Sequence, residues 1–246
     1  MSATVNHLLV QDVGKVRILT LDRAEKLNAL NRPLVERLTQ ELANAEASED
    51  VRAVVIAGCP KAFSAGVDLN ETKKLSSAND IGAHADRIAG LFLALNKMET
   101  PVIAAVEGFA LGGGCGLAMA CDSVVASNTA VFGYPEVTKG VMPALVAPNL
   151  VKRIGPKDTF ILLALGQQYS AKAFREMGLV SAIVTPGTAR AEAISIAGTL
   201  AAHDRRIIGW IKSLVRNCDG LSLEDGFAHA REVNASTRET LKTRER

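Results

Sequence analysis

A run of glycines between two apolar segments is the feature of this sequence best suited to chemistry. Gly112, Gly113 and Gly114 follow the β-branched segment 101–106 and precede an Ala/Leu/Met-rich segment, which predicts a strand, a turn and a helix. Residues without a Cβ let a ligand approach the backbone closely, and the first turn of a helix presents unpaired N–H groups and the positive end of the helix dipole. The pattern therefore predicts a site for a negatively charged oxygen.

This turn has three interpretations, two of which bind a negatively charged oxygen. A phosphate is disfavoured, because no Lys-Ser or Lys-Thr follows the glycines and neither Gly112 nor Gly113 begins a complete G-x-G-x-x-G. An oxyanion hole, for a carbonyl that becomes an enolate or a tetrahedral adduct, fits the pattern. A plain tight turn, at which a helix packs on a sheet, fits the glycines equally well.

Composition and charge describe an ordinary globular protein. The 246 residues are 48% hydrophobic and 22% charged, enough for a core that encloses an active site. The net charge of +2 gives no reason to expect nucleic acid or a membrane as a partner. The four cysteines form no C-x-x-C pair and the four histidines are isolated, so we expect no metal. With no signal-peptide pattern and no membrane-spanning apolar run, we expect a cytoplasmic location.

Apolar periodicity predicts the elements that must position the glycines. The predicted strands and helices are a hairpin over 8–21, a helix from Asn31, a strand over 51–58, a helix over 76–98, strands over 101–106, 122–127 and 130–133, helices over 145–154, 156–165 and 171–177, and a strand over 180–184. Residues 61–69 are interpreted as a loop of small residues, and Ile81, Ala85 and Ile88 as buried positions of the helix over 76–98. The recurring β-β-α order predicts an α/β domain over 1–187 and a helical region over 188–246.

Four stretches together resemble the crotonase family, also called the enoyl-CoA hydratase/isomerase superfamily. They are LDRAEKLNAL (21–30), KAFSAGVDL (61–69), PVIAAVEGFALGGGCGLAMACD (101–122) and FGYPE (132–136). The resemblance implies a spiral of β-β-α units, a C-terminal helical region that assembles a homotrimer or a hexamer, and thioesters of coenzyme A as ligands. Coenzyme A then enters as part of the substrate, and no separate cofactor is expected.

The resemblance also implies roles for individual residues. Family members hold the thioester oxygen with two main-chain N–H groups, which match Val67 and Gly113 of this sequence. The residues that would line the CoA pocket are Lys26, Leu27, Ala29, Ala65, Asp68 and Leu69. Taken singly, Lys26 is equally typical of a solvated surface and Leu27 of a core, so the assignment applies to the set.

One glutamate stands where two are usual. Relatives that hydrate enoyl thioesters carry one directly after Gly-Gly-Gly-Cys and one in the Pro-Glu element, whereas this chain has Gly116 and Glu136 there. Adding water across a double bond uses a positioned nucleophile and a proton donor, but a 1,3-proton shift needs one group that removes and returns a proton. We predict that Glu136 is this base and acid, with a pKa raised by apolar neighbours. A helix cap or a surface position is the alternative.

Other groups could replace the missing glutamate. Glu107 and Asp122 flank the glycine segment and are more typical of structural carboxylates, while Asp68 is implied to fix its loop. An ordered water in the space beside Gly116 is a further candidate. A second departure, the segment 142–148 in place of the family's Pro-Gly-x-Gly-Gly, implies an altered acyl-chain preference.

The sequence therefore predicts an enoyl-CoA hydratase or isomerase that acts through a thioester enolate. Two alternatives remain open. A catalytically silent acyl-CoA-binding protein would explain Gly116, and a CoA-thioester decarboxylase or retro-aldol lyase would use the same oxyanion hole.

Overall fold

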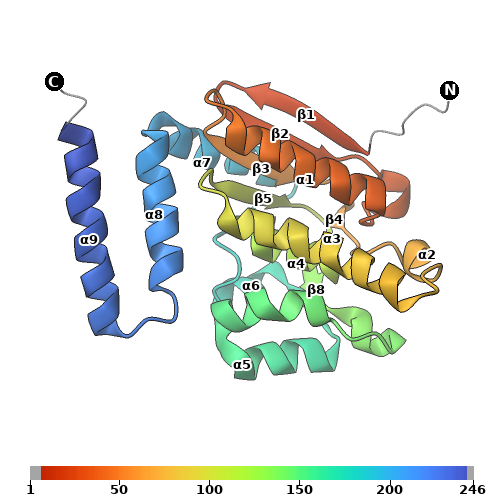
Figure 1. Ribbon diagram of the computed structural model, residues 1–246. Coiled ribbons are helices and arrows are strands. Elements are labelled where there is room, and N and C mark those ends of the chain that lie inside the picture. The colour runs from red at the N-terminus through yellow and green to blue at the C-terminus, as the bar shows by residue number, and fades with distance from the viewer. Residues whose placement is uncertain (1–6, 243–246) are drawn as a thin grey trace.

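Two sheets, with helices around them, make up the part of the chain that is described, residues 7–242 of a computed structural model (Figure 1). The strands are β1 (Leu8–Val13), β2 (Val16–Leu21), β3 (Ala53–Ala57), β4 (Ala62–Ser64), β5 (Val102–Val106), β6 (Phe109–Leu111), β7 (Ser123–Ser127), β8 (Val131–Gly133), β9 (Gln168–Ser170) and β10 (Ala182–Val184). The helices are α1 (Arg32–Ala47), α2 (Leu69–Thr72), α3 (Ala78–Lys97), α4 (Gly113–Ala120), α5 (Ala147–Leu165), α6 (Ala171–Glu176), α7 (Ala189–Ala202), α8 (Arg205–Cys218) and α9 (Leu223–Lys242), with 3-10 turns η1 (Ala24–Lys26), η2 (Pro135–Lys139) and η3 (Ala144–Val146).

The strand order shows a mixed α/β architecture. The larger sheet runs β1-β2-β3-β5-β7-β10, in which β1 and β2 form the predicted antiparallel hairpin and the other neighbours are parallel. The smaller sheet runs β4-β6-β8-β9, with β4, β6 and β8 parallel and β9 antiparallel to β8. Parallel strands need long crossover connections, and helices α1, α3 and α4 supply them.

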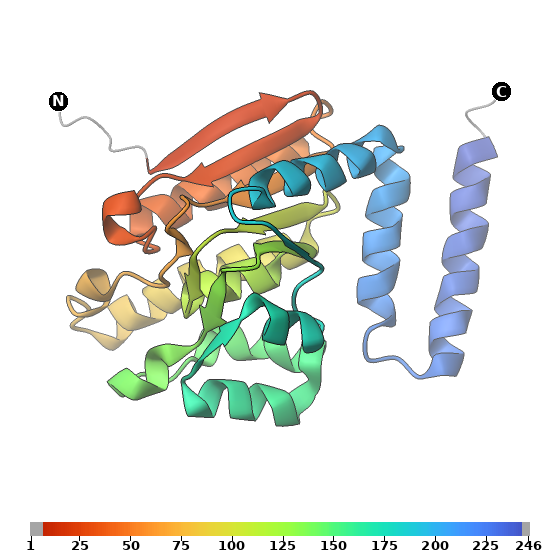
Figure 2. The ribbon, with the colours of Figure 1, turned by 180° about the vertical axis from the view of Figure 1, so that it is seen from behind.

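Helix α7 covers one face of the larger sheet (Figure 2). Its buried positions are four alanines at intervals of four residues, Ala189, Ala193, Ala197 and Ala201, which pack with residues of β2, β3, β5 and β7. Alanine side chains are small, so α7 packs closely on the strands. It does so although it lies beyond residue 187, in the predicted helical C-terminal region. Only α8 and α9 extend away from the sheets as a helical hairpin (Figures 1 and 2). No helix within residues 7–242 is both long and apolar enough to cross a membrane.

Three strands were absent from the prediction. β4, β6 and β9 have three residues each, too few for an alternating pattern to stand out, and β4 lies inside the segment 61–69 that was interpreted as a loop. The glycine turn therefore follows β6 and not directly β5. Ile81 was also predicted to be buried, but 55% of its surface is exposed.

The first turn of α4 lies against the end of β4. A Cβ on Gly114 would come 2.4 Å from the Ser64 carbonyl oxygen and 2.6 Å from the Ser64 Cβ. These contacts are shorter than any real Cβ contact, and backbone atoms cannot move aside cheaply. Glycine at position 114 is therefore what allows the loop after β4 to meet the start of α4.

We expect Gly114→Ala to lower the free energy of unfolding by about 2 kcal/mol or more, because the added methyl group overpacks this contact. The matched control is Gly90→Ala in the interior of α3, where a Cβ would have nothing within 4 Å. There, alanine should stabilise the protein by about 0.5 to 1 kcal/mol through its higher helix propensity. Urea unfolding of both variants measures this, and equal effects would contradict the close approach.

Candidate active site

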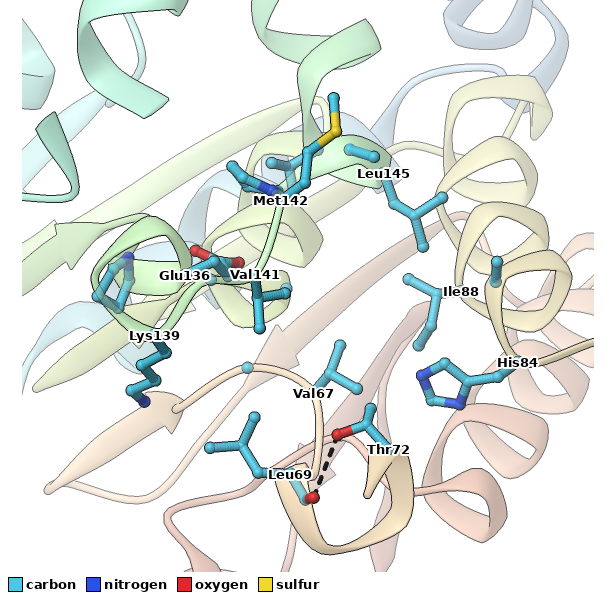
Figure 3. Close-up of a pocket in the computed structure, with 18 of the residues that line it drawn as sticks. Val67, Leu69, Thr72, His84, Ile88, Glu136, Lys139, Val141, Met142 and Leu145 are labelled. Atoms are coloured by element: carbon cyan, nitrogen blue, oxygen red, sulfur yellow. Dashed lines mark hydrogen bonds between the residues drawn. The ribbon is translucent and has the colours of Figure 1, made fainter. Parts of the chain in front are cut away.

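A cavity of about 420 Å³ lies between the loop after β4, helix α3, and the segment of η2 and η3 (Figure 3). The three predicted catalytic positions, Val67, Gly113 and Glu136, all line it, and so do Ala65 and Leu69 from the predicted CoA set. Parallel strands explain how they meet. Val67 follows the end of β4, Gly113 the end of β6, and Glu136 the end of β8, so three neighbouring carboxyl ends supply the three groups.

The main-chain nitrogens of Val67 and Gly113 lie close together. A Cβ on Gly113 would be 3.5 Å from the Val67 nitrogen, and a Cβ on Gly66 would be 3.2 Å from the Gly113 nitrogen. Val67 forms a β-bridge with Leu30, but the bonds of this bridge join Leu30 N–H to the Gly66 carbonyl and Asp68 N–H to the Leu30 carbonyl. Within residues 7–242, neither the Val67 N–H nor the Gly113 N–H has a hydrogen-bond acceptor. Both donors are thus available to a ligand.

Hydrogen bonds to the turn at 23–28 hold the loop that carries Val67. The Ala65 N–H donates to the Leu27 carbonyl at 2.9 Å, and the Ser64 hydroxyl donates to the Asn28 carbonyl at 2.8 Å. Leu27 and Asn28 take left-handed backbone angles, with φ of 50° and 54°. Asn28 is fully buried, and its side chain donates to the Ala62 carbonyl at 2.9 Å. The turn and the loop therefore form one rigid unit.

Glu136 lies in η2 with its carboxylate toward the glycine turn. A Cβ on Gly112 would come 2.7 Å from Glu136 Oε1, so the glycine leaves the space that the carboxylate occupies. Glu136 Oε2 is buried and has no hydrogen-bond partner in the described part of the chain. Burial raises the pKa of Glu136, against the opposing effects of its own backbone N–H and of the Lys139 charge. This is the direction that the sequence predicted.

The space beside Gly116 is filled by apolar side chains. A Cβ on Gly116 would come 2.6 Å from Val146 Cγ1 and 3.0 Å from Phe92 Cζ. Both residues are buried. Because a water needs room and several polar partners, these contacts disfavour the alternative of an ordered water directly beside Gly116. The position that carries a glutamate in hydrating relatives is here closed by a ring and a branched aliphatic chain.

Glu107 and Asp122 do not replace the missing carboxylate. Glu107 accepts hydrogen bonds from the N–H groups of Gly187 and Ala189 and so caps the start of α7. Asp122 accepts from the Val102 N–H and from Lys212 Nζ at 2.7 Å. Both are structural carboxylates, as their places in the sequence indicated.

Known proteins resemble this chain over nearly its whole length. A family model described as enoyl-CoA hydratase/isomerase matches residues 12–245. The chain belongs to the enoyl-CoA hydratase/isomerase family. A Rhizobium meliloti protein named "Probable enoyl-CoA hydratase" is 38% identical over 227 residues, which cover 92% of this chain and 87% of that protein. The 2,3-dehydroadipyl-CoA hydratase of Escherichia coli is 33% identical and covers 93% of this chain and 89% of the relative.

The fold agrees with that of solved family members. The crystal structure of an enoyl-CoA hydratase from Mycobacterium smegmatis matches with a TM-score of 0.89 at 30% identity, covering 94% of this chain and 91% of that one. The predicted crotonase-like α/β fold with C-terminal helices is thereby confirmed. The chain is an enzyme of the enoyl-CoA hydratase type.

The predicted CoA-pocket residues of this hydratase-type enzyme fall into two groups. Ala65 and Leu69 line the cavity, whereas Lys26, Leu27, Ala29 and Asp68 lie outside its lining. Lys26 is exposed, and Leu27 and Ala29 are half-buried. Their contact with CoA stays a prediction, and so does that of Asp68, whose carboxylate instead pairs with Arg23 Nη1 at 2.5 Å and caps α2 through the Asn70 N–H.

Several residues of the cavity were not singled out from the sequence. No sequence motif marks Phe92 and Val146, because their role depends on packing against Gly116. His84 and Lys139 also line the cavity. A signal for His84 was present, since it falls within the predicted apolar stripe of α3 beside Ala85.

We expect Asp68→Asn to lower the free energy of unfolding by about 2 kcal/mol at neutral pH, because the half-buried Arg23 guanidinium loses the nearer of its anionic neighbours. Burial alone would raise the pKa of Asp68, but the hydrogen bonds from Arg23 and the Asn70 N–H lower it overall. A lowered pKa in the folded state contributes stability above the ordinary value of 3.8. This contribution is lost as the pH falls through the lowered value.

Urea unfolding at neutral pH and at a series of acidic pH values tests this expectation. The difference between wild type and Asp68→Asn should shrink below the ordinary aspartate pKa. Asp12→Asn, in the more exposed pair with Arg17, is the matched control and should cost less than about 1 kcal/mol. A difference between wild type and Asp68→Asn that does not change with pH would contradict the ionic role of Asp68.

Proposed function

We propose that this family member transforms enoyl-CoA thioesters through a thioester enolate, with one glutamate as acid and base. In this proposal the N–H groups of Val67 and Gly113 bind the thioester oxygen, and Glu136 moves the proton. The supporting observation is that the unpartnered carboxylate oxygen of Glu136 and the two unpaired N–H groups line the same cavity. Donors fixed where negative charge develops stabilise the transition state by about 3 kcal/mol each.

The proposed steps use groups of this chain alone. Glu136 removes a proton from the carbon between the thioester carbonyl and the double bond of a 3-enoyl thioester. The C–H electron pair moves into a dienolate whose oxygen lies between the two N–H groups. The same carboxylic acid then returns the proton to a different carbon, so the double bond has migrated and Glu136 is a carboxylate again. A raised pKa of Glu136 suits the removal of the proton, because it makes the carboxylate a better base at neutral pH. Coenzyme A is part of the substrate, and the steps require no other cofactor.

Double-bond migration is the reaction that the cavity supports best. Phe92 and Val146 close the space that a second glutamate or a bound water would need beside Gly116. Hydration by Glu136 alone is the second candidate, and the names of the relatives favour it. Decarboxylation and retro-aldol cleavage would use the same oxyanion hole and would also need a group that moves a proton, so they stay the alternatives among enolate reactions. A silent acyl-CoA binder would gain nothing from such a group.

The proposal includes assembly into a homotrimer or a hexamer through the C-terminal helices. The support is a set of exposed apolar side chains on α8 and α9. They are Ile207, Ile211, Val215, Leu223 and Phe227.

Purified protein should convert 3-enoyl-CoA thioesters to 2-enoyl-CoA thioesters, and Glu136→Gln should lose at least about a hundredfold in kcat because it removes the proton-transfer group. Chromatographic separation of the two isomers measures the reaction, and 2-enoyl thioesters in the same panel test for water addition. Glu176→Gln, the same change at an exposed glutamate of α6 outside the cavity, is the control and should leave kcat unchanged. Binding of thioesters without turnover, or full activity of Glu136→Gln, would contradict the proposal.

The rate should also depend on pH through Glu136. Because the base must be deprotonated and its pKa is raised, kcat/KM should rise with pH through an apparent pKa above the ordinary glutamate value of 4.5. A profile of kcat/KM against pH on one 3-enoyl thioester measures this pKa. A flat profile from the ordinary glutamate pKa upward would contradict a buried glutamate base.

A further inference from the structure

We propose that His84 is a specificity-determining residue that donates a hydrogen bond to an oxygen on the acyl chain. The proposal rests on the function proposed above and names its substrate class. The preferred substrates are acyl-CoA thioesters whose chain carries a hydroxyl, oxo or carboxylate oxygen at the depth of His84.

His84 is the polar exception in an apolar wall. Ile81, Ala85, Ile88 and Phe92 follow one another at helical spacing along α3, and all of them line the cavity. His84 lies in the same stripe, and its ring points into the cavity toward Thr72 and Val67 (Figure 3). A stripe that served only to hold an unsubstituted alkyl chain would have no use for an imidazole between Ile81 and Ala85.

The imidazole is available to a ligand. None of the hydrogen bonds between described residues involves the side chain of His84, and the residue is half-buried. Thr72, its polar neighbour in the cavity, already donates its hydroxyl proton to the Leu69 carbonyl at 3.1 Å. Burial lowers the pKa of His84, the Arg87 charge lowers it further, and the Glu71 charge opposes them. A neutral imidazole carries one N–H donor, which suits an acceptor oxygen.

The position of His84 along α3 places it away from the end of the apolar stripe that meets Gly116. Phe92 is the α3 residue that meets Gly116 beside the glycine turn, and it lies eight residues, about 12 Å, farther along the helix. Ala85 and Ile88 lie between and offer only apolar surface, which fits methylene groups. A plain chain that reached His84 would bury the imidazole without a partner, whereas an oxygen there would satisfy it. This difference favours the oxygenated chain.

The test compares matched 3-enoyl-CoA substrates of equal length that end in a methyl group, a hydroxyl or a carboxylate, in a series of increasing length. Wild type should prefer an oxygenated chain by about threefold to tenfold in kcat/KM at the length that reaches His84. His84→Leu should abolish this preference by lowering kcat/KM for the oxygenated substrates. His84→Gln, which keeps an N–H donor, should retain part of it. A carboxylate preferred over a hydroxyl would add a contribution from the Arg87 charge.

His203→Leu, the same change at an exposed histidine after α7, is the control and should leave all ratios unchanged. If the wild-type enzyme prefers the methyl-ended chain at every length, this result alone overturns the proposal. An equal change for all substrates in His84→Leu would also overturn it, since the residue would then act on the CoA part or on cavity shape. In both cases the methyl-ended thioesters still turn over and the proposed function stands. Loss of turnover for every thioester in wild type would instead refute the proposed function.

Discussion

The close approach of two backbone segments is the constraint on which the site depends. The loop after β4 meets the first turn of α4 at distances that no side chain would tolerate, and Gly66, Gly113 and Gly114 remove the Cβ atoms that would keep them apart. The β4–β6 pairing, with Ala62 opposite Phe109, brings these segments together. Without this contact the Val67 and Gly113 nitrogens would not face a common point.

The same small sheet positions the carboxylate. Leu111 of β6 is in register with Gly133 of β8, and the Gly112 N–H donates to the Gly133 carbonyl at 2.8 Å. Glu136 follows three residues later and fills the space that Gly112 leaves open. The two N–H groups and the carboxylate therefore share one rigid frame, so the proposed reaction would need little reorganisation of the site. The larger sheet with α1, α3 and α4 supplies the core in which Phe63, Ala110 and Phe132 of the smaller sheet are buried.

Short motifs allowed the sequence to predict this frame but not the walls of the cavity. Val67, Gly113 and Glu136 lie in motifs whose residues are close together in the sequence. The longer buried strands can be recognised from their runs of apolar, β-branched residues. The three-residue strands β4, β6 and β9 carry too little pattern to be recognised, although two of them carry the site. Phe92 and Val146 are 24 residues before and 30 residues after Gly116, so only the folded chain reveals that they fill its space.

The most direct test of the account is a crystal structure of the protein with a non-hydrolysable acyl-CoA analogue bound. The account predicts that the carbonyl oxygen of the analogue lies within hydrogen-bonding distance of both the Val67 and the Gly113 nitrogens. The carboxylate of Glu136 should then contact the carbons next to that carbonyl. A carbonyl oxygen bound elsewhere in the cavity, or a Glu136 carboxylate turned to solvent, would contradict it.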